Sequence, residues 1–259
     1  MCYDVQTNLE AQLKRAKRLN DPKAIAEITE KLKPYTKNYF HAPGFAHPML
    51  LIYGNDNPTE PAPATWGLIP SWVKSDADKL KLWNNTLNAK SETIFEKPAF
   101  RASAKQMRCI VPVVAFFEHH HKGGKSYPYR IFRKDGAPMH LAGLWSEWTN
   151  RETGEIVKSF SIVTTQANEL LSTIHNNPKM NEARMPVILT EESENIWLDT
   201  ATHGELDKEV KNLLNPYPSE EMDAYPVARL RGKEAVGNSE ELTEKKYYPE
   251  LEENQGSLF

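Results

Sequence analysis

The sequence predicts an α+β fold with mostly antiparallel strand pairing. Apolar runs with strand periodicity cluster in the 259-residue chain, and helical patterns lie near its start and in its last third. The strands do not alternate regularly with helices, which argues against a doubly wound parallel sheet. No linker interrupts the chain before about residue 238. We therefore expect one domain over residues 1–238 and an acidic, flexible tail over residues 239–259.

The first predicted elements are two helices within residues 8–33. Apolar residues recur there with partly amphipathic helical spacing, and the pattern breaks at residues 20–22. Asp21 is a suitable N-cap for the second helix, with Pro22 at its first position. The apolar positions are Leu9, Leu13, Ala16, Ile25, Ile28 and Leu32.

Strands are predicted next, from short apolar runs bounded by turn residues. The runs on either side of Lys134-Asp135-Gly136 predict a hairpin. The expected strands cover residues 50–53, the start of 65–72, and 107–118, 127–133, 138–145, 156–164 and 185–189. Short helices are expected over residues 167–174, 191–199 and 205–213.

Composition and charge narrow the class of protein. Hydrophobic residues make up 39% of the chain and charged residues 26%, as in an ordinary globular protein. No run approaches the ~20 apolar residues of a membrane span. The start of the chain lacks the apolar core of a signal peptide. We expect a cytoplasmic monomer without a membrane partner.

The charge is unevenly distributed along the chain. The net charge is −3, but residues 201–259 hold 13 acidic and 7 basic residues. The remainder is therefore mildly basic, which is compatible with a local phosphate-binding groove.

The two cysteines have different expected roles. Cys109 lies in the apolar run CIVPVVAFF and is expected to be a buried strand residue. Cys2 follows the initiator methionine, so removal of Met1 would leave an N-terminal cysteine. Its α-amine, with a pKa of about 7.7–8.0, and its thiol, with a pKa of about 8.5, would then share one residue. Such a pair can form a Schiff base with an aldehyde and close it to a thiazolidine, which no internal cysteine can do.

Several segments along the chain carry a family resemblance. Together with the Met-Cys start they are TWGLIPSW (65–72), LNAKSETIFEKPAFR (87–101), FFEHH (116–120), TIHNNPKMNEARMPVIL (173–189) and YPVARLRGKEAVGN (225–238). In this order they resemble the SOS-response-associated peptidase (SRAP) family of abasic-site processing proteins. The resemblance implies a barrel-like β core with flanking helices. It also implies binding of single-stranded DNA and covalent capture of abasic sites in the DNA damage response, without a cofactor.

The resemblance also implies roles for individual residues. Cys2 corresponds to the nucleophile that forms the thiazolidine. Asn88 corresponds to the asparagine that positions the N-terminal residue and the sugar. Glu118 corresponds to the catalytic glutamate, and His175 to the histidine that assists proton transfer at the sugar oxygen. A glutamate and a histidine suit the exchange of protons near neutral pH.

Some positions depart from the family pattern. The usual Met-Cys-Gly-Arg start is Met-Cys-Tyr-Asp here, and Asp4 cannot contact a phosphate. Lys90 replaces an arginine and offers a cation without a bidentate fork. His41 stands near a position where the family has asparagine, and extra residues separate His175 from Arg184.

DNA contacts are expected from cations and aromatic residues around these motifs. Core packing is the competing expectation for the tryptophans. The expected DNA-binding residues are Lys90, Arg184, Trp66, Trp72, Pro43 and His119, with Arg101 as a further cation. Residues 119–121 are three adjacent histidines, but neighbours on a strand alternate faces, so we expect no metal site there.

The last residues of the sequence resemble an interaction motif. Gln255, Leu258 and Phe259 resemble the bacterial sliding-clamp binding motif. An exposed Leu-Phe pair at a polar terminus has no evident role in folding, which favours recruitment to a replication clamp.

Two alternatives remain open. An N-terminal-nucleophile amidohydrolase would also use an exposed Cys2, with its amine as the base. A DNA- or clamp-binding adaptor without catalysis would leave Cys2 incidental. The peptidase name of the family implies self-processing of the N-terminus, and lyase activity at abasic sites is a further expectation.

Overall fold

The computed structural model describes residues 2–202 and 208–252, and its core is a closed barrel of five strands. The strands follow the order β10 (Ile156–Gln166), β4 (Ala62–Trp66), β3 (Met49–Gly54), β6 (Arg108–Val113) and β9 (Met139–Thr149). Pairing of β9 with β10 closes the ring. Most neighbours are antiparallel, whereas β4 and β10 are parallel. The α+β, mostly antiparallel, barrel-like core is thus confirmed.

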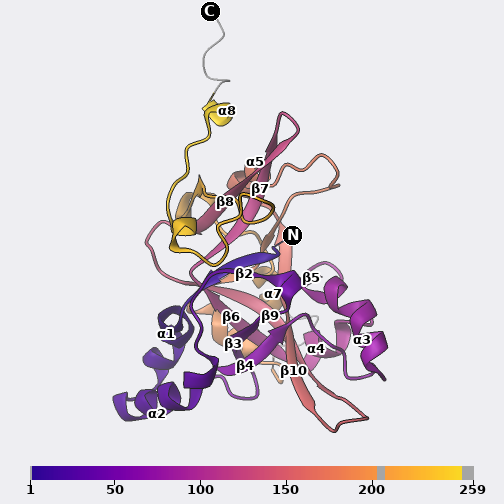
Figure 1. Ribbon diagram of the computed structural model, residues 1–259. Coiled ribbons are helices and arrows are strands. Elements are labelled where there is room, and N and C mark those ends of the chain that lie inside the picture. Colours follow the sequence, from indigo (N-terminus) through magenta and orange to yellow (C-terminus); the bar gives the residue numbers. More distant parts are fainter. Residues whose placement is uncertain (1, 203–207, 253–259) are drawn as a thin grey trace, which may run out of the picture.

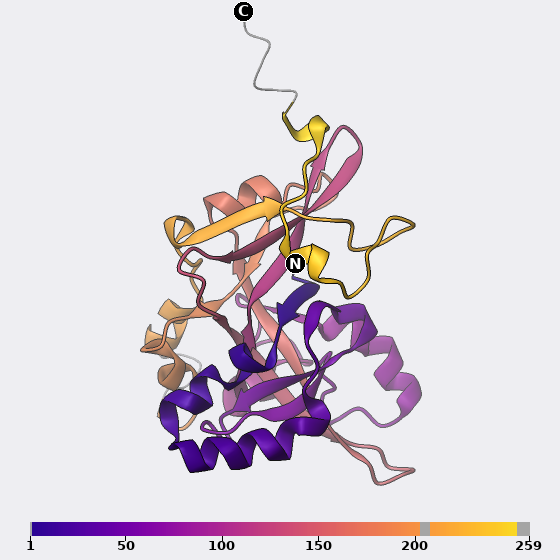
Figure 2. The same cartoon turned by 60° about the vertical axis from the view of Figure 1, so that its left-hand side comes forward.

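A second sheet lies beside the barrel. Its order is β13 (Met222–Pro226), β8 (Lys125–Arg133), β7 (Ala115–Lys122), β1 (Asp4–Thr7) and β2 (Tyr39–Pro43). Figures 1 and 2 show β7 and β8 at one end of the molecule and helices α1 and α2 at the other. Short strands extend the barrel sheet, namely β5 (Asn88–Lys90), β11 (Arg184–Pro186) and β12 (Ile188–Leu189).

The helices flank the β core. As expected, the first two are separate: Asn8 caps α1, and Asp21 caps α2 by accepting from the Ala24 amide. The α-helices are α1 (Leu9–Leu19), α2 (Pro22–Leu32), α3 (Asp76–Trp83), α4 (Arg101–Gln106), α5 (Glu169–Ile174), α6 (Ser193–Leu198), α7 (Lys208–Leu213) and α8 (Pro249–Glu252). The 3-10 helices are η1 (Lys33–Tyr35), η2 (Gly44–Ala46), η3 (Asn84–Thr86), η4 (Ser219–Glu221) and η5 (Glu240–Thr243). Within the described ranges, each helix is too short or too polar to cross a membrane.

Two strand predictions are wrong where the chain passes between the sheets, and residues 185–189 also form two short strands, β11 and β12, instead of one. Residues 107–118 form two strands instead of one, because the chain bends at Val114, whose amide bonds to the Gln6 carbonyl of the second sheet. The expected hairpin around residues 134–136 does not form either. Its two arms, β8 and β9, pair with strands of different sheets. Local periodicity identifies a strand but not its partner.

The core continues from the barrel into the second sheet. One apolar cluster joins Val111 of β6, Phe116 of β7 and Val5 of β1, and it includes Cys2. Cys109 is fully buried on β6, as the sequence predicts. A separate cluster lies between the barrel and helices α1, α2 and α6. Cys2 is therefore packed inside the molecule.

Residues 239–252, which the sequence assigns to the tail, contact the domain. Leu242 of η5 is fully buried against Phe117 and Val227. The Tyr248 hydroxyl donates to the Val227 carbonyl at 2.8 Å, and Lys125 pairs with Glu250. The proposed clamp-binding residues Gln255, Leu258 and Phe259 lie outside the described residues.

Candidate active site

Cys2 is held at the junction of the barrel and the second sheet. Strand β1 pairs antiparallel with β7, with Asp4 opposite Phe117, and the same register extended by one residue puts Tyr3 opposite Glu118. The Cys2 side chain is fully buried. Burial, followed by the negative charge of Glu118, raises the pKa of the thiol well above its ordinary value. The buried thiol is therefore protonated at neutral pH.

Asn88 fixes the main chain of Cys2. It lies on β5, which runs parallel to β10 of the barrel, and its amide nitrogen donates to the Cys2 carbonyl at 2.7 Å. Among the described residues, its buried Oδ1 has no hydrogen-bond partner. An unsatisfied buried acceptor is costly in a folded protein, so this oxygen is available to a group that enters the site.

Glu118 is the buried carboxyl of the site. It lies on β7 and is 5% exposed. Burial is the largest effect on this group, and it raises the pKa of Glu118 to about 7. Near neutral pH the side chain is thus present in both protonation states, which allows it to accept or to donate a proton.

His175 lies beside Glu118 at the C-cap of α5. Its Nε2 is 3.6 Å from Glu118 Oε2 and 3.1 Å from Met180 Sδ. Its Nδ1 lies 3.0 Å from the Arg184 carbonyl oxygen and 3.2 Å from the Arg184 amide, contacts that orient the ring. Burial lowers the pKa of His175 to about 4, so the imidazole is neutral at physiological pH.

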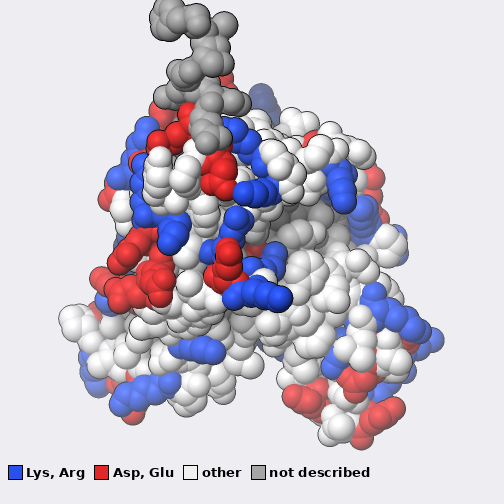
Figure 3. Space-filling view, turned by 45° about the horizontal axis from the view of Figure 1, so that its top comes forward, with Lys and Arg blue, Asp and Glu red and all other residues white. Residues whose placement is uncertain are grey.

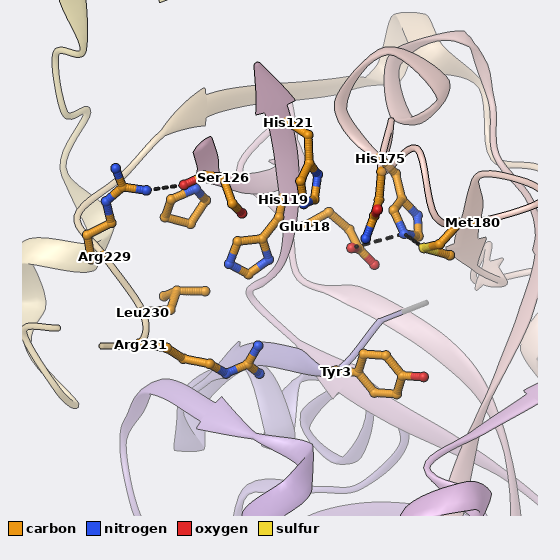
Figure 4. Close-up of a pocket in the computed structure, with 12 residues that line it drawn as sticks. Tyr3, Glu118, His119, His121, Ser126, His175, Met180, Arg229, Leu230 and Arg231 are labelled. Carbon is orange, nitrogen blue, oxygen red and sulfur yellow. Dashed lines mark hydrogen bonds and ion pairs between the residues drawn. The ribbon is translucent and has the colours of Figure 1, made fainter. Parts of the chain in front are cut away.

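A cleft of about 450 Å³ opens next to this group. In Figure 4, Glu118, His175 and Met180 lie on one side of it, and Arg229 and Arg231 lie on the other. The lining also includes Tyr3, His119, His121, Ser126, Pro128, Asn177 and Leu230. Cys2 and Asn88 do not line the cleft. Cys2 directly precedes the lining residue Tyr3, and Asn88 contacts the Cys2 carbonyl.

The Asp4 carboxylate is paired with Arg231, which lies 227 positions later in the sequence. It is 2% exposed, and both of its oxygens lie 2.7 Å from Arg231 Nη2. His41 Nε2 approaches Asp4 Oδ1 at 2.7 Å. Sequence reasoning identified Asp4 as unsuited to phosphate but did not identify Arg231. The cluster of cations over residues 229–233 was the available signal.

Two of the residues expected to contact DNA are buried in this structure. Trp66 is fully buried, donates to the Leu87 carbonyl and stacks with Phe160, so it presents no face to a base. Arg184 is 1% exposed and is bound by Glu92 and Glu182, so its charge is already paired inside the protein. In this conformation both side chains contact other groups of the protein instead of facing solvent.

The other expected DNA-contacting residues remain accessible to different degrees. Lys90 pairs with Glu182 at 2.8 Å and is 43% exposed in its side chain. Trp72 is 50% exposed and lines a separate shallow cavity beside Val73 and Leu82. Pro43 is partly buried at the end of β2, and His119 lines the cleft.

The surroundings of the triple histidine agree with strand geometry. His119, His120 and His121 are consecutive on β7, and the His120 ring contacts the Thr173 carbonyl while His121 lines the cleft. Burial lowers the pKa of His119 to about 4. Over the described part of the chain, no group of three or more His, Cys, Asp or Glu side chains is arranged to hold a metal ion. Arg101, the further expected cation, is exposed at the start of α4.

Sequence comparison relates the chain to proteins named for abasic sites. It is 37% identical over 180 residues to the abasic site processing protein YoqW of Bacillus subtilis, covering 69% of this chain and 74% of that protein. It is 31% identical over 183 residues to the abasic site processing protein HMCES of Gallus gallus, covering 63% of this chain and 51% of that protein.

Solved structures and a family model extend the similarity to nearly the whole chain. A crystal structure of a Bacteroides thetaiotaomicron protein superposes with a TM-score of 0.78 at 33% identity, covering 95% of this chain and all of that one. A Bordetella bronchiseptica protein gives a TM-score of 0.67 at 26% identity, covering 87% and 99%. The model of the SOS response associated peptidase (SRAP) family matches residues 1–234. The chain belongs to the SRAP family.

Proposed function

We propose that this protein binds single-stranded DNA and captures abasic sites covalently through Cys2 after removal of Met1. The proposal rests on one observation: Cys2 lies close to Asn88, Glu118 and His175, beside an open cleft. Relatives named as abasic site processing proteins support the choice of an abasic sugar as the reacting aldehyde.

The first step is the formation of a Schiff base. The Cys2 amine attacks C1′ of the opened sugar, and the resulting carbinolamine loses its hydroxyl as water. One group must take a proton from the nitrogen and another must donate a proton to the departing hydroxyl. Glu118, with a pKa of about 7, suits both roles, and neutral His175 at 3.6 Å suits proton exchange with it.

The second step closes the ring. Sγ of Cys2 bonds to the imine carbon, the π electrons move to nitrogen, and the thiol proton is transferred to that nitrogen. Because burial keeps the thiol protonated, the step needs a nearby base, and the Glu118 carboxylate is close enough to affect the thiol pKa. The net reaction converts an aldehyde and an aminothiol into a thiazolidine and water.

Asn88 is proposed to orient the reactants. Its Nδ2 fixes the Cys2 carbonyl, which limits rotation of the residue that carries both nucleophiles. Its unpartnered Oδ1 can accept a hydrogen bond from the Cys2 amine or from a sugar hydroxyl. An amide does this without titrating, so its contribution is independent of pH.

A denaturing gel tests the proposal. Protein shown by mass to lack Met1 is mixed with single-stranded oligonucleotides with and without one abasic site. We expect a slow band that needs the abasic site, survives denaturation without reductant and disappears in Cys2→Ala. Cys109→Ala, which alters the other buried cysteine, is the matched control and should retain the band.

The same gel separates the alternatives. Borohydride should trap the reversible Schiff base of the Cys2→Ala amine, and strand scission would reveal lyase activity. Absence of a band from protein lacking Met1 contradicts the proposal. Glutamine hydrolysis would then favour the amidohydrolase, and retained DNA binding by Cys2→Ala would favour the adaptor.

Protein kept with Met1 should not crosslink, and mass analysis of purified wild-type protein incubated alone will show whether it removes Met1 itself.

Recruitment to a sliding clamp is a separate part of the proposal. It rests on the sequence of Gln255, Leu258 and Phe259. Deletion of residues 255–259 should abolish retention of the protein by an immobilised bacterial clamp and leave crosslinking unchanged. If the intact protein is not retained, the clamp proposal fails while the chemistry at Cys2 stands.

A further inference from the structure

We propose that Arg231 binds a DNA phosphate next to the abasic site, and that Asp4 holds the guanidinium in place. This inference rests on the proposed function and adds a phosphate-binding position to it. Arg231 lies in the segment after β13. It is far from Cys2 in the sequence, yet the fold brings it to the cleft.

The two partners of the ion pair between Asp4 and Arg231 differ in exposure to solvent. Asp4 is 3% exposed in its side chain, whereas Arg231 is 49% exposed. The negative partner is thus inside the protein and the positive partner faces outward. Among the described residues, Arg231 donates hydrogen bonds through Nη2, to the two carboxylate oxygens of Asp4. The remaining donors of the planar guanidinium suit the oxygens of a phosphate.

The position of Arg231 matches the position of the reactive residue. Cys2 and Asp4 are two residues apart in extended chain, so their side chains share a face about 7 Å apart. The burial of Cys2 and Asp4 with a less buried Tyr3 between them fits this alternation. Arg231 reaches the cleft from Asp4, on the same face of the chain as Cys2. A sugar at Cys2 therefore brings a flanking phosphate within reach of Arg231.

The surrounding cleft favours an anion. Glu118 is the one carboxylate among the described residues that line it, and at neutral pH it is partly protonated. Arg229 also lines the cleft, but it donates to the Ser126 carbonyl of β8 and lies 3.7 Å from Glu234, so it is engaged by other groups of the protein. In Figure 4, Arg231 extends towards the middle of the cleft below His119. Figure 3 shows further Lys and Arg side chains around the hollowed part of this face.

The experiment measures binding of undamaged single-stranded DNA by the full chain at several salt concentrations. Removing one phosphate contact should lower the slope of log affinity against log salt by about 0.7. We expect this for Arg231→Gln, with a loss of affinity of roughly 5- to 10-fold at low salt that is similar for all sequences. Arg231→Lys should give an intermediate loss. Arg151→Gln, which removes an exposed arginine beyond the end of β9, is the matched control and should change neither quantity.

The outcomes separate a binding role from a structural one. If Arg231 only neutralises Asp4, Arg231→Gln will lower the thermal midpoint without changing the salt slope, and the inference is wrong. Equal losses in Arg231→Gln and Arg151→Gln would also overturn it. Should Arg231→Gln unfold at the assay temperature, Arg231→Lys decides, because it keeps a cation beside Asp4. Binding of undamaged DNA does not involve the crosslink. The result can therefore be interpreted even if the thiazolidine proposal fails.

Discussion

At the residue scale, burial sets the chemistry of the site. Glu118 and His175 lie 3.6 Å apart, and burial moves their pKa values in opposite directions, to about 7 and about 4. Desolvation penalises the charged form of each group, which is the protonated histidine and the deprotonated glutamate. The pair is therefore mostly neutral just below pH 7, and Glu118 is the member that exchanges protons in the working range.

The raised pKa of Glu118 predicts that replacing this residue with neutral glutamine stabilises the protein at high pH. The native state holds the proton up to about pH 7 and the unfolded state releases it near 4.5, so this group's contribution to stability is lost as pH rises between those values. Glu118→Gln should become more stable relative to wild type by up to about 3 kcal/mol between pH 4.5 and pH 8.

Urea unfolding of both proteins at pH 4.5, 6 and 8 checks this. The difference between them is the quantity to follow, because the lowered pKa of His175 makes its own contribution rise from about pH 4 to 6.5. A difference independent of pH would contradict the assignment. The same variant should crosslink about 100-fold more slowly or worse, as expected for loss of a general acid–base group.

Asn88 predicts a loss of rate with a small loss of stability. Asn88→Ala removes the bond to the Cys2 carbonyl, which should cost about 1 kcal/mol of unfolding free energy and slow crosslinking at saturating DNA by at least roughly tenfold. Asn85→Ala, an exposed asparagine three positions earlier, is the control and should change neither. Single-turnover crosslinking with denaturant titration measures both. An unchanged rate would remove Asn88 from the site.

At the element scale, helix α1 is attached to the barrel by a buried charge cluster. Glu194 of α6 is fully buried and contacts Arg15 and Arg18 of α1 and His140 of β9. Burial alone would raise the pKa of Glu194, but the His140 hydrogen bond and the two arginine charges lower it below its ordinary value. The cluster joins three elements far apart in sequence.

Glu194→Gln is therefore expected to destabilise the fold strongly. It leaves Arg15, which is 2% exposed, without its charged partner, at a cost of roughly 3 kcal/mol. Glu191→Gln is the matched control, because Glu191 is 51% exposed and also pairs with Arg18, so its loss should cost about 0–1 kcal/mol. Urea unfolding at pH 7 distinguishes the two. Equal costs would show that the cluster does not hold α1.

At the scale of the whole molecule, the segment after β13 supports the second sheet. The segment after β13 carries Arg231 to the cleft, and η5 then places Leu242 against Phe117 of β7, next to Glu118. Figure 2 shows this yellow segment running along the end of the molecule that holds β7 and β8. The sheet that bears Glu118 is thus covered by the last described residues.

Two truncations test this arrangement. Ending the chain after residue 238 removes buried Leu242 and the Tyr248 hydrogen bond, which should cost roughly 3 kcal/mol. Ending it after residue 252 keeps both and should leave the thermal midpoint within about 2 °C of wild type. Thermal unfolding measures the two midpoints. If the longer truncation is as stable as the shorter one, residues 239–252 do not support the sheet.

The sequence by itself determined much of the local structure and the family of the chain. The cap at Asp21, the strand periodicity and the Met-Cys start act over a few residues, so they can be recognised without knowledge of the fold. The α+β class and family membership followed from these patterns and from the order of the motifs. The four residues expected to carry the chemistry were named from the same motifs.

Only the tertiary structure decided which residues meet and which are exposed. The change of sheet at Val114, the burial of Trp66 and the paired charge of Arg184 depend on partners distant in the chain. Asp4 and Arg231 are separated by 227 positions, and no periodicity links them. Periodicity reports the face a residue presents, whereas burial and pairing depend on what the rest of the chain packs against that face.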